Sequence, residues 1–415
     1  AREKKEQESD RYISLNGEWR FSYYTSPFLV PDEVVGDDYD DGKWDFIPVP
    51  GHWQLHGYDR PCYNDAFALF PITDRPSIQA DNPTGVYRRE LRIDKKEGKE
   101  YLLRFDGVES AYHVWVNGEF AGYSQGSRNT AEFDVTKLLR NGSNHLAVKV
   151  YKYSDGSYLE NQDMWWFAGI IRDVGLIVRD EIFVEDFKIE SSLHNAYRDG
   201  VFRIWARIGC HTGRTEKITA EVSLFDKEKL IFSQEQILED VQDSAEVSFE
   251  KTIEGVRAWS AEDPYLYQTV ITLKKDGELT EAYGCRTGFR SVELKNGLFY
   301  INGAALKLKG VNRHDWNAYT GRCITDRDML ADLYMMKQNN INAVRTAHYP
   351  PGPRFLDMCD ELGFYVMEEA DLECNQMAYT NKMNRISDAV DWEASYIDRA
   401  DRMIRRDKNH PSVFS

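Results

Sequence analysis

The chain has 415 residues and a formal net charge of −17, with 42% hydrophobic and 13% aromatic residues. This length predicts two to four domains, each with a core of its own. The negative charge argues against nucleic acid and anionic membranes as partners, and no apolar run reaches the roughly 18 residues that a transmembrane helix needs.

The six cysteines are scattered without a CxxC pair, which is typical of reduced thiols, and the polar first residues show no signal peptide. From these two features we expect a cytoplasmic protein. The 24 tyrosines and 10 tryptophans suit the cores of β-sandwiches, and they also suit sugar binding, because aromatic rings stack on the apolar face of a pyranose. Core packing explains most of them.

Residues 1–178 have the pattern of an all-β domain, in which short alternating segments are separated by Gly, Pro and Asn. The clearest local feature is Asn117-Gly118, which separates two alternating segments at 113–116 and 119–123. An Asn-Gly pair in this setting is the strongest short signal for a β-hairpin. We predict a sandwich of jelly-roll type.

Residues 179–290 continue the alternation, with strands expected at 202–208, 220–225 and 268–273. Several short strands within roughly 110 residues predict an immunoglobulin-like β-sandwich. No chemistry-bearing motif stands out in this stretch. We expect it to act as a spacer and support.

Residues 291–415 change to alternating strands and helices, which predicts a parallel sheet with right-handed crossovers. A strand at 306–312 leads to a helix capped by Thr325, and a later helix is expected at 392–407. Three strands and the start of a fourth cannot close an eight-stranded barrel, which takes roughly 250 residues. We therefore expect an incomplete TIM barrel, belonging to a longer protein or needing a complementing fragment.

The most informative segment is 342–350, Asn-Ala-Val-Arg-Thr-Ala-His-Tyr-Pro. It reads as a strand that ends in Arg345 and His348 and is followed by a proline pair and an amphipathic helix. In a parallel α/β barrel the carboxyl ends of the strands carry the chemistry. The segment therefore predicts that a site lies there.

This segment resembles, almost letter for letter, a motif of the glycoside hydrolase family 2 β-galactosidases, and the resemblance extends along the whole chain. The other segments that carry it, in the order of the family, are 82–87, 154–165, 169–174, 310–315, 369–373 and 406–413. The resemblance implies retaining hydrolysis of terminal β-D-galactosides such as lactose, through a covalent galactosyl–enzyme intermediate. It also implies a small-molecule galactoside as partner and a homo-oligomer when the protein is complete.

Residue by residue, the resemblance implies that Asn82, Asp163, His314 and His348 contact the sugar. Arg345 would hold the carboxylate of the nucleophile in place and keep it ionised. Each of these residues could instead have a purely structural role. Either histidine could be structural, Arg345 could form an ion pair in the barrel mouth, and Asp163 could cap a turn.

The resemblance also implies two metal ions. Asp163 matches a sodium ligand, and Glu373 matches a ligand of the active-site Mg²⁺. The family's histidine two residues later is Asn375 here, which puts the magnesium site in question, although an amide oxygen still suits Mg²⁺. A zinc site at His314 and His348 is not expected, because no third ligand follows at a recognisable spacing.

No catalytic residue is expected within this chain, because the family's acid/base and nucleophile glutamates correspond to positions beyond Ser415. Glu368, Glu369 and Glu373 are close in sequence, but the resemblance gives none of them the acid/base or nucleophile role. Glu368 and Glu369 also cannot both face a substrate, since neighbouring residues of a strand point to opposite sides. Cys374 lies in the expected active-site loop, but nothing beside it marks a nucleophile. The chain alone is therefore expected to be inactive.

Two other interpretations stay open. Within the family, the activity could be that of a β-glucuronidase or β-mannosidase, although the loops around Asn82 and Asp163 resemble the galactosidase branch. In a different class, the chain could be a non-catalytic galactoside-binding or complementation fragment.

Overall fold

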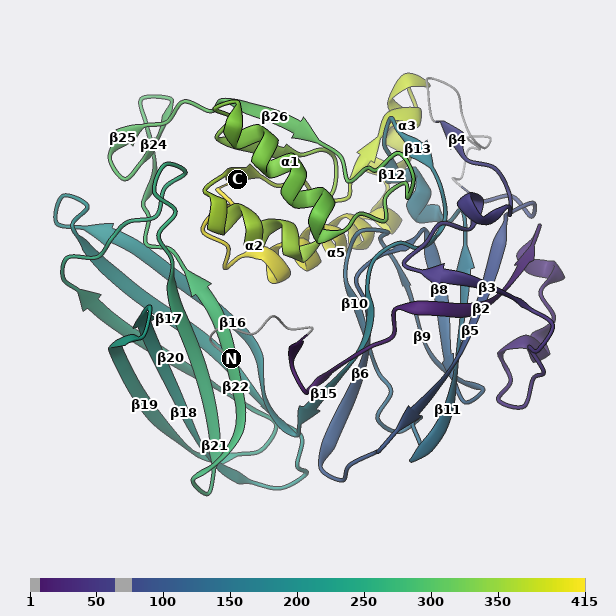
Figure 1. The fold of residues 1–415 in the computed structure, drawn as a ribbon, viewed down its shortest axis with the longest axis horizontal. Helices are drawn as coiled ribbons and strands as arrows, with labels where there is room; N and C mark the ends of the chain where they lie inside the picture. Colours follow the sequence, from purple (N-terminus) through teal and green to yellow (C-terminus); the bar gives the residue numbers. More distant parts are fainter. Residues whose placement is uncertain (1–7, 64–76, 415) are drawn as a thin grey trace.

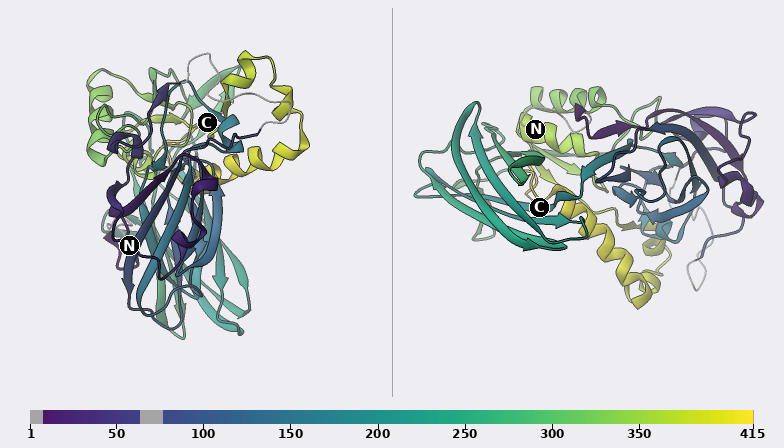
Figure 2. Two further views of the ribbon diagram at one scale, coloured as in Figure 1. Left: turned by 90° about the vertical axis from the view of Figure 1, so that its right-hand side faces the viewer. Right: turned by 90° about the horizontal axis from the view of Figure 1, so that it is seen from below.

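A computed structural model describes residues 8–63 and 77–414. Two β-sandwiches lie side by side, and the strand–helix elements of the third part lie across one end of both (Figure 1). The views in Figure 2 show the same arrangement from the side and from below. The predicted fold class, a jelly roll, an immunoglobulin-like sandwich and the start of a TIM barrel, is confirmed.

The first sandwich packs a six-stranded sheet on a four-stranded one. In spatial order the larger sheet holds β3 (Asp45–Val49), β2 (Gly17–Tyr24), β5 (Thr84–Ile93), β11 (Gly142–Tyr151), β8 (Ala111–Val116) and β9 (Glu119–Gln125). The smaller sheet holds β1 (Tyr12–Ser14), β15 (Val174–Asp180), β6 (Lys99–Phe105) and β10 (Ala131–Asp134). Fully buried side chains such as Trp19, Phe105 and Val148 fill the space between the sheets.

The predicted hairpin of this domain is confirmed. β8 and β9 pair antiparallel around Asn117 and Gly118, which have φ angles of 54° and 81°. Both angles lie in the left-handed region that the favoured two-residue hairpin turn requires.

The second sandwich packs a three-stranded sheet on a four-stranded one. The strands are β16 (Ile182–His194), β17 (Asp199–Cys210) and β20 (Ser244–Ile253) on one side, and β19 (Lys229–Val241), β18 (Glu216–Asp226), β21 (Tyr267–Lys275) and β22 (Glu278–Thr287) on the other. Alternating burial along β17 and β18 gives each strand one core face, as the sequence pattern predicted.

The third part begins with the small sheet of β23 (Val292–Lys295), β24 (Leu298–Ile301) and β25 (Ala304–Ala305). A parallel sheet follows, made of β26 (Gly310–Arg313), β27 (Ala343–Thr346) and β28 (Tyr365–Met367). The larger helices are α1 (Asp326–Gln338), α2 (Pro353–Leu362) and α5 (Val390–Asp407), with the short α3 (Asn375–Tyr379) and α4 (Asn384–Ser387) between them. Thr325 and Asp328 form a reciprocal cap at the start of α1, as predicted.

One predicted strand is wrong in its extent. The segment 306–312 was expected to be a strand throughout, but β26 begins only at Gly310. The Asn342 side chain takes the place of a ladder partner, because its oxygen accepts from the Lys309 N–H at 2.7 Å and its amide donates to the Lys307 carbonyl at 3.2 Å. A side chain that binds backbone groups in this way competes with regular pairing.

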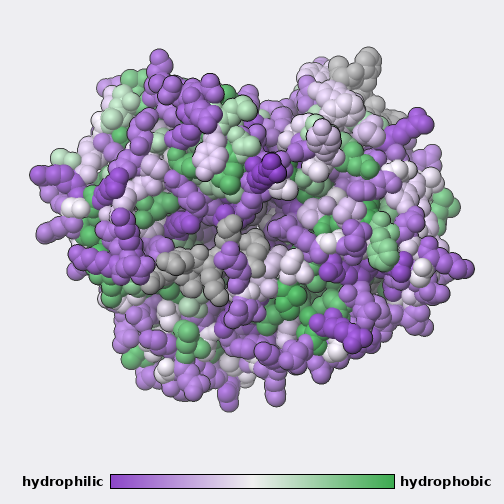
Figure 3. Space-filling model, viewed as in Figure 1, coloured by the Kyte–Doolittle hydropathy of each residue, from purple (hydrophilic) through white to green (hydrophobic). Residues whose placement is uncertain are grey.

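Hydrophilic side chains dominate the face shown in Figure 3, and hydrophobic ones form small separate groups on it. All six cysteines are free thiols. Within the described ranges, no helix is long and apolar enough to cross a membrane.

Candidate active site

The carboxyl ends of three neighbouring parallel strands bring three of the predicted residues, His314, Arg345 and His348, together. In the register of β26, β27 and β28, Arg313 lies opposite Thr346 and Arg345 lies opposite Met367. His314, His348 and Glu369 follow those strand ends within two residues. Three side chains that are distant in sequence therefore meet at one edge of the sheet.

Glu369 is the centre of a hydrogen-bonded group that holds Arg345 and His348. One carboxylate oxygen of Glu369 accepts from Arg345 Nε at 2.5 Å, and the other lies 2.9 Å from His348 Nδ1. His348 Nε2 lies 3.6 Å from Glu373 Oε2. Within the described residues Arg345 thus binds the carboxylate of Glu369. Its role in holding the carboxylate of the nucleophile stays a prediction.

His314 lies beside this group and takes part in a different set of bonds. Its ring centre lies 5.6 Å from that of His348, and its Nδ1 lies 3.2 Å from the Tyr349 hydroxyl. The same hydroxyl accepts from the Asp315 backbone N–H at 3.1 Å. Burial lowers the pKa of His314, and nearby His348 and Arg128 lower it further, so this imidazole is neutral at neutral pH.

A loop of the first sandwich is joined to the site through the backbone. β12 (Glu160–Asn161) pairs in parallel with β29 (Glu373–Cys374), and the Glu373 N–H donates to the Leu159 carbonyl at 2.6 Å. Asp163 follows β12 on the same loop. Its side chain is exposed, and its carboxylate makes no hydrogen bond or ion pair within the described ranges.

Asn82 comes from another loop of the first sandwich, and the backbone of Tyr153 occupies its side chain. The Asn82 amide donates to the Tyr153 carbonyl at 2.8 Å, and the Asn82 side-chain oxygen accepts from the Tyr153 N–H at 2.9 Å. Asn82 is buried. These bonds fix the loop that begins at Tyr153, and any sugar contact of Asn82 would come in addition to them.

Beneath the site, three guanidinium groups and three carboxyl groups form a buried network between the first sandwich and the barrel part. It contains Arg128, Arg322, Arg399, Glu109, Glu160 and Asp371. Arg128 lies at its centre, with Asp371 and Glu109 both 3.3 Å away. Burial raises the pKa of Glu109 to about 7, whereas the three carboxyl groups raise the pKa of Arg128 despite its burial. The sequence pattern contained no signal for this network.

The residues expected to hold metal ions differ in how well they fit. Glu373 Oε2 is buried without a hydrogen-bond partner in the described part of the chain, which leaves it free to act as a ligand. The Asn375 side chain binds the Glu373 carboxyl group, and burial raises the pKa of Glu373. A carboxylate with a neighbouring amide is a donor set that suits Mg²⁺, and the free carboxylate of Asp163 is compatible with a monovalent cation.

Two neighbouring groups lack the properties of a catalytic residue. Burial raises the pKa of the Cys374 thiol to about 11, so little of the nucleophilic thiolate exists at neutral pH. Glu368 is buried and faces Arg406 and Asp407, whereas Glu369 faces Arg345 and His348. The two glutamates point to different surroundings, as expected.

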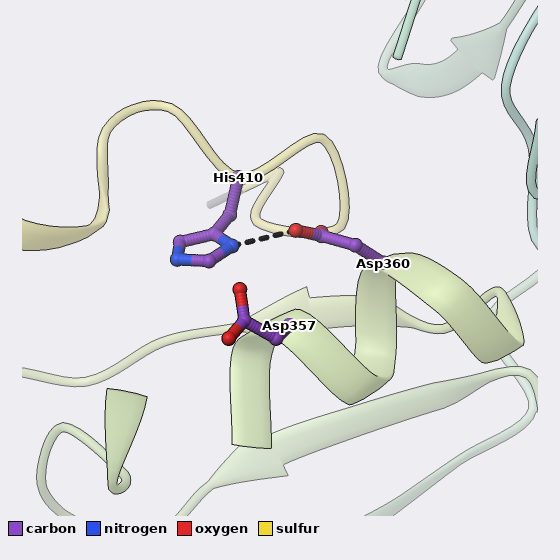
Figure 4. Close-up of side chains that lie close together, drawn as sticks. All are labelled: Asp357, Asp360 and His410. Atoms are coloured by element: carbon purple, nitrogen blue, oxygen red, sulfur yellow. Dashed lines mark hydrogen bonds and ion pairs between the residues drawn. The ribbon is translucent and has the colours of Figure 1, made fainter. Parts of the chain in front are cut away.

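A third cluster of potential ligands, Asp357, Asp360 and His410, lies at α2 and the turn after α5 (Figure 4). His410 Nδ1 lies 2.6 Å from Asp360 Oδ2. Burial alone would lower the pKa of His410, but Asp360 and other carboxylates raise it to about 9. The imidazole is therefore a cation at neutral pH and a poor metal ligand. The ion pair instead fastens the turn to α2.

A cavity of about 1670 Å³ lies elsewhere, where the three parts of the molecule meet. Its lining comes from all three parts and includes Arg104, Tyr283 and Arg405. His314, His348 and Glu373 do not line it. We assign the site from the converging polar groups and not from the size of this cavity.

The chain matches three descriptions of one family. They are "Glycosyl hydrolases family 2, sugar binding domain" over residues 12–179, "Glycosyl hydrolases family 2" over residues 182–290, and "Glycosyl hydrolases family 2, TIM barrel domain" over residues 292–414. The chain is 41% identical over 412 residues to a β-galactosidase of Psychromonas ingrahamii, covering 96% of this chain and 39% of that protein. A β-galactosidase of Vibrio cholerae is also 41% identical, with 97% and 40% covered.

The chain thus spans about two fifths of the length of these curated relatives. Among solved structures, a family 2 member from Bacteroides cellulosilyticus has a TM-score of 0.77 at 24% identity, covering 97% of this chain and 52% of that one. A β-glucuronidase of Bacteroides uniformis has a TM-score of 0.79 at 22% identity, with 97% and 46% covered. These two likenesses show the fold. The predicted resemblance is confirmed, and the chain belongs to glycosyl hydrolase family 2.

Proposed function

We propose that this chain is the sugar-binding part of a β-galactosidase, which hydrolyses terminal β-D-galactosides such as lactose with retention of configuration. The observation that carries the proposal is the meeting of His314, His348, Arg345 and Glu373 beside a loop of the sugar-binding domain. The 41% sequence identity to two curated β-galactosidases supports galactosides as the substrate class.

In this proposal His314, His348, Asp163 and Asn82 bind hydroxyl groups of the sugar. The ion pair of Arg345 and Glu369 keeps His348 in place through the Glu369 carboxylate. Binding groups of this kind accelerate hydrolysis when they hold the transition state more tightly than the ground state. A bound Mg²⁺ would be held by Glu373 and Asn375 and would supply positive charge, and Asp163 would hold Na⁺.

The two catalytic carboxyl groups of a retaining glycosidase lie about 5 Å apart, one as nucleophile and one as acid/base. We assign neither role to the carboxyl groups near His348. Glu369 is bound by Arg345 and His348, Glu368 faces away, and Glu373, 3.6 Å from His348, is the proposed metal ligand. We infer that the remaining part of the protein supplies both, and that homo-oligomers form in the complete protein.

A hydrolysis assay with a chromogenic β-galactoside tests this proposal. We expect no turnover by the pure 415-residue chain. A protein extended to the full length of its β-galactosidase relatives should hydrolyse the substrate, with β-galactose as first product. Turnover by the 415-residue chain alone would contradict the inference that the rest of the protein supplies both catalytic carboxyl groups. A complete protein that hydrolyses β-glucuronides and not β-galactosides would contradict the substrate class.

A further inference from the structure

Tyr349 has a hydroxyl group whose hydrogen bonds can be assigned completely. The side chain is buried, and its hydroxyl lies within hydrogen-bond distance of two groups in the described part of the chain. One is the Asp315 backbone N–H at 3.1 Å, and the other is His314 Nδ1 at 3.2 Å.

The direction of these two bonds follows from their chemistry. A backbone N–H can only donate, so the Tyr349 oxygen accepts from Asp315. The phenolic proton then needs an acceptor, because a buried donor without a partner destabilises the folded chain. The acceptor within reach is His314 Nδ1. An imidazole nitrogen that accepts carries no proton, so the proton of the neutral His314 ring must be on Nε2.

The ring of Tyr349 is held in place independently of its hydroxyl. The guanidinium carbon of Arg128 lies 4.8 Å from the centre of the Tyr349 ring, a distance at which a cation is attracted to an aromatic face. Arg128 is itself anchored by Asp371 and Glu109. Tyr349 therefore connects the buried ion network to His314.

The neighbouring histidine has the opposite arrangement. His348 Nδ1 lies 2.9 Å from a Glu369 oxygen and 3.3 Å from a guanidinium nitrogen of Arg345. The shorter contact is with a carboxylate, which can only accept, so the Nδ1 of His348 carries a proton. His314 therefore carries its proton on Nε2, whereas His348 carries one on Nδ1.

We propose that Tyr349 is a positioning residue, which holds His314 as the tautomer with its proton on Nε2, so that this ring offers an N–H donor to a sugar hydroxyl. The tautomer follows from the geometry of this chain, whereas the role toward a sugar rests on the proposed function. The charged and titratable groups that act on His314 are His348, Arg128, Asp315 and Arg313, and none of them replaces Tyr349 as a hydrogen-bond partner of Nδ1.

Long-range ¹H–¹⁵N correlation spectra of the 415-residue chain, labelled with ¹⁵N-histidine, report which ring nitrogen carries the proton. The chain has 9 histidines, and spectra of His314→Gln and His348→Gln identify the two relevant signals. We expect an unprotonated Nδ1 and a protonated Nε2 for His314, and a protonated Nδ1 for His348. A proton on Nδ1 of neutral His314 in the unaltered chain would overturn the proposal without any variant.

Tyr349→Phe keeps the ring over Arg128 and removes only the hydroxyl. We expect the His314 signals to shift toward a mixture of both tautomers and the His348 signals to stay unchanged. Tyr101→Phe is the matched control, because the Tyr101 hydroxyl also accepts from a backbone N–H, that of Lys96 at 2.8 Å, but in the first sandwich. An unchanged His314 tautomer in Tyr349→Phe would overturn the role of Tyr349.

Galactose titration of the same samples separates this proposal from the proposed function. If the tautomer changes in Tyr349→Phe and galactose binding weakens severalfold, both hold. If the tautomer changes but neither protein binds galactose, the positioning role holds and the sugar-binding role of the chain fails.

Discussion

Asp371 and Glu373 stand two residues apart in the segment after β28 but differ in burial and in hydrogen bonding. Asp371 is fully buried, and its oxygens accept from Gln162 at 2.9 Å, from the Arg128 side chain at 3.3 Å and from the Arg128 N–H at 3.1 Å. The side chain of Glu373 is a quarter exposed, and its Oε2 has no hydrogen-bond partner in the described residues.

This difference gives the two residues different roles, one in domain docking and one in ligand binding. The carboxylate of Asp371 is used up by docking the first sandwich on the barrel part, since its partners come from that sandwich. Glu373 Oε2, which lies 3.6 Å from His348 Nε2, accepts no hydrogen bond within the described residues and is therefore available to a ligand. The buried network around Arg128, to which Asp371 belongs, is a closed group of charges that holds the domains together. Next to it, Glu373, His348 and His314 form an open group, which is the site.

The largest effect is expected from Arg128→Met, which breaks the closed group. Removal of one partner from a buried ion network leaves carboxylates uncompensated and costs roughly 3–5 kcal/mol. Urea unfolding followed by tryptophan fluorescence would measure it. A loss below about 1 kcal/mol would mean that the network does not hold the two domains together.

The His410–Asp360 ion pair should make the free energy of unfolding depend on pH. The pKa of His410 is raised from 6.5 to about 9 in the folded chain, so its contribution to stability is full below about pH 6.5 and is lost as the pH rises through 9. The pKa difference corresponds to roughly 3 kcal/mol. Urea midpoints measured between pH 6 and pH 10 should fall in the unaltered chain and fall much less in His410→Asn. Equal slopes in the two proteins would contradict the assignment.

The open group is tested by Mg²⁺ added to the unaltered chain and to Glu373→Gln. A ligand that binds the folded state at 100 times its dissociation constant stabilises it by about 2.7 kcal/mol. We expect this rise in thermal stability in the unaltered chain and its loss in Glu373→Gln. Glu393→Gln, at an exposed position of α5, should respond like the unaltered chain. A response that persists in Glu373→Gln would place the ion elsewhere.

The smallest effect is expected from Arg203→Ala in the second sandwich. Its pair with Glu250 at 2.9 Å is largely exposed, and exposed pairs add little because solvent screens them. Urea unfolding should show a midpoint within error of the unaltered chain. A marked loss would mean that burial does not decide which ion pairs matter in this molecule.

Much of the fold follows from local patterns in the sequence. Asn117-Gly118 set a hairpin by their backbone angles, and Thr325 with Asp328 set a helix start, because both signals depend on neighbours in the chain. The segment 306–312 shows where this fails: Asn342, more than thirty residues later, binds the backbone at Lys307 and Lys309 and shortens the strand.

The site could be predicted only in part for the same reason. Arg345 and His348 stand at a strand end that the sequence marks clearly. Arg128 and Tyr349 acquire their roles through partners from distant segments, such as Asp371 and Asp315. No spacing within one segment reveals such a contact.

The most direct test of the central account is a galactose titration of the ¹⁵N-histidine-labelled chain. If the open group binds the sugar, the signals of His314 and His348 should shift in a saturable manner, while those of His410 and His52, which lie in closed surroundings, should not move. No saturable shift at His314 and His348, or equal shifts at all four histidines, would contradict the account.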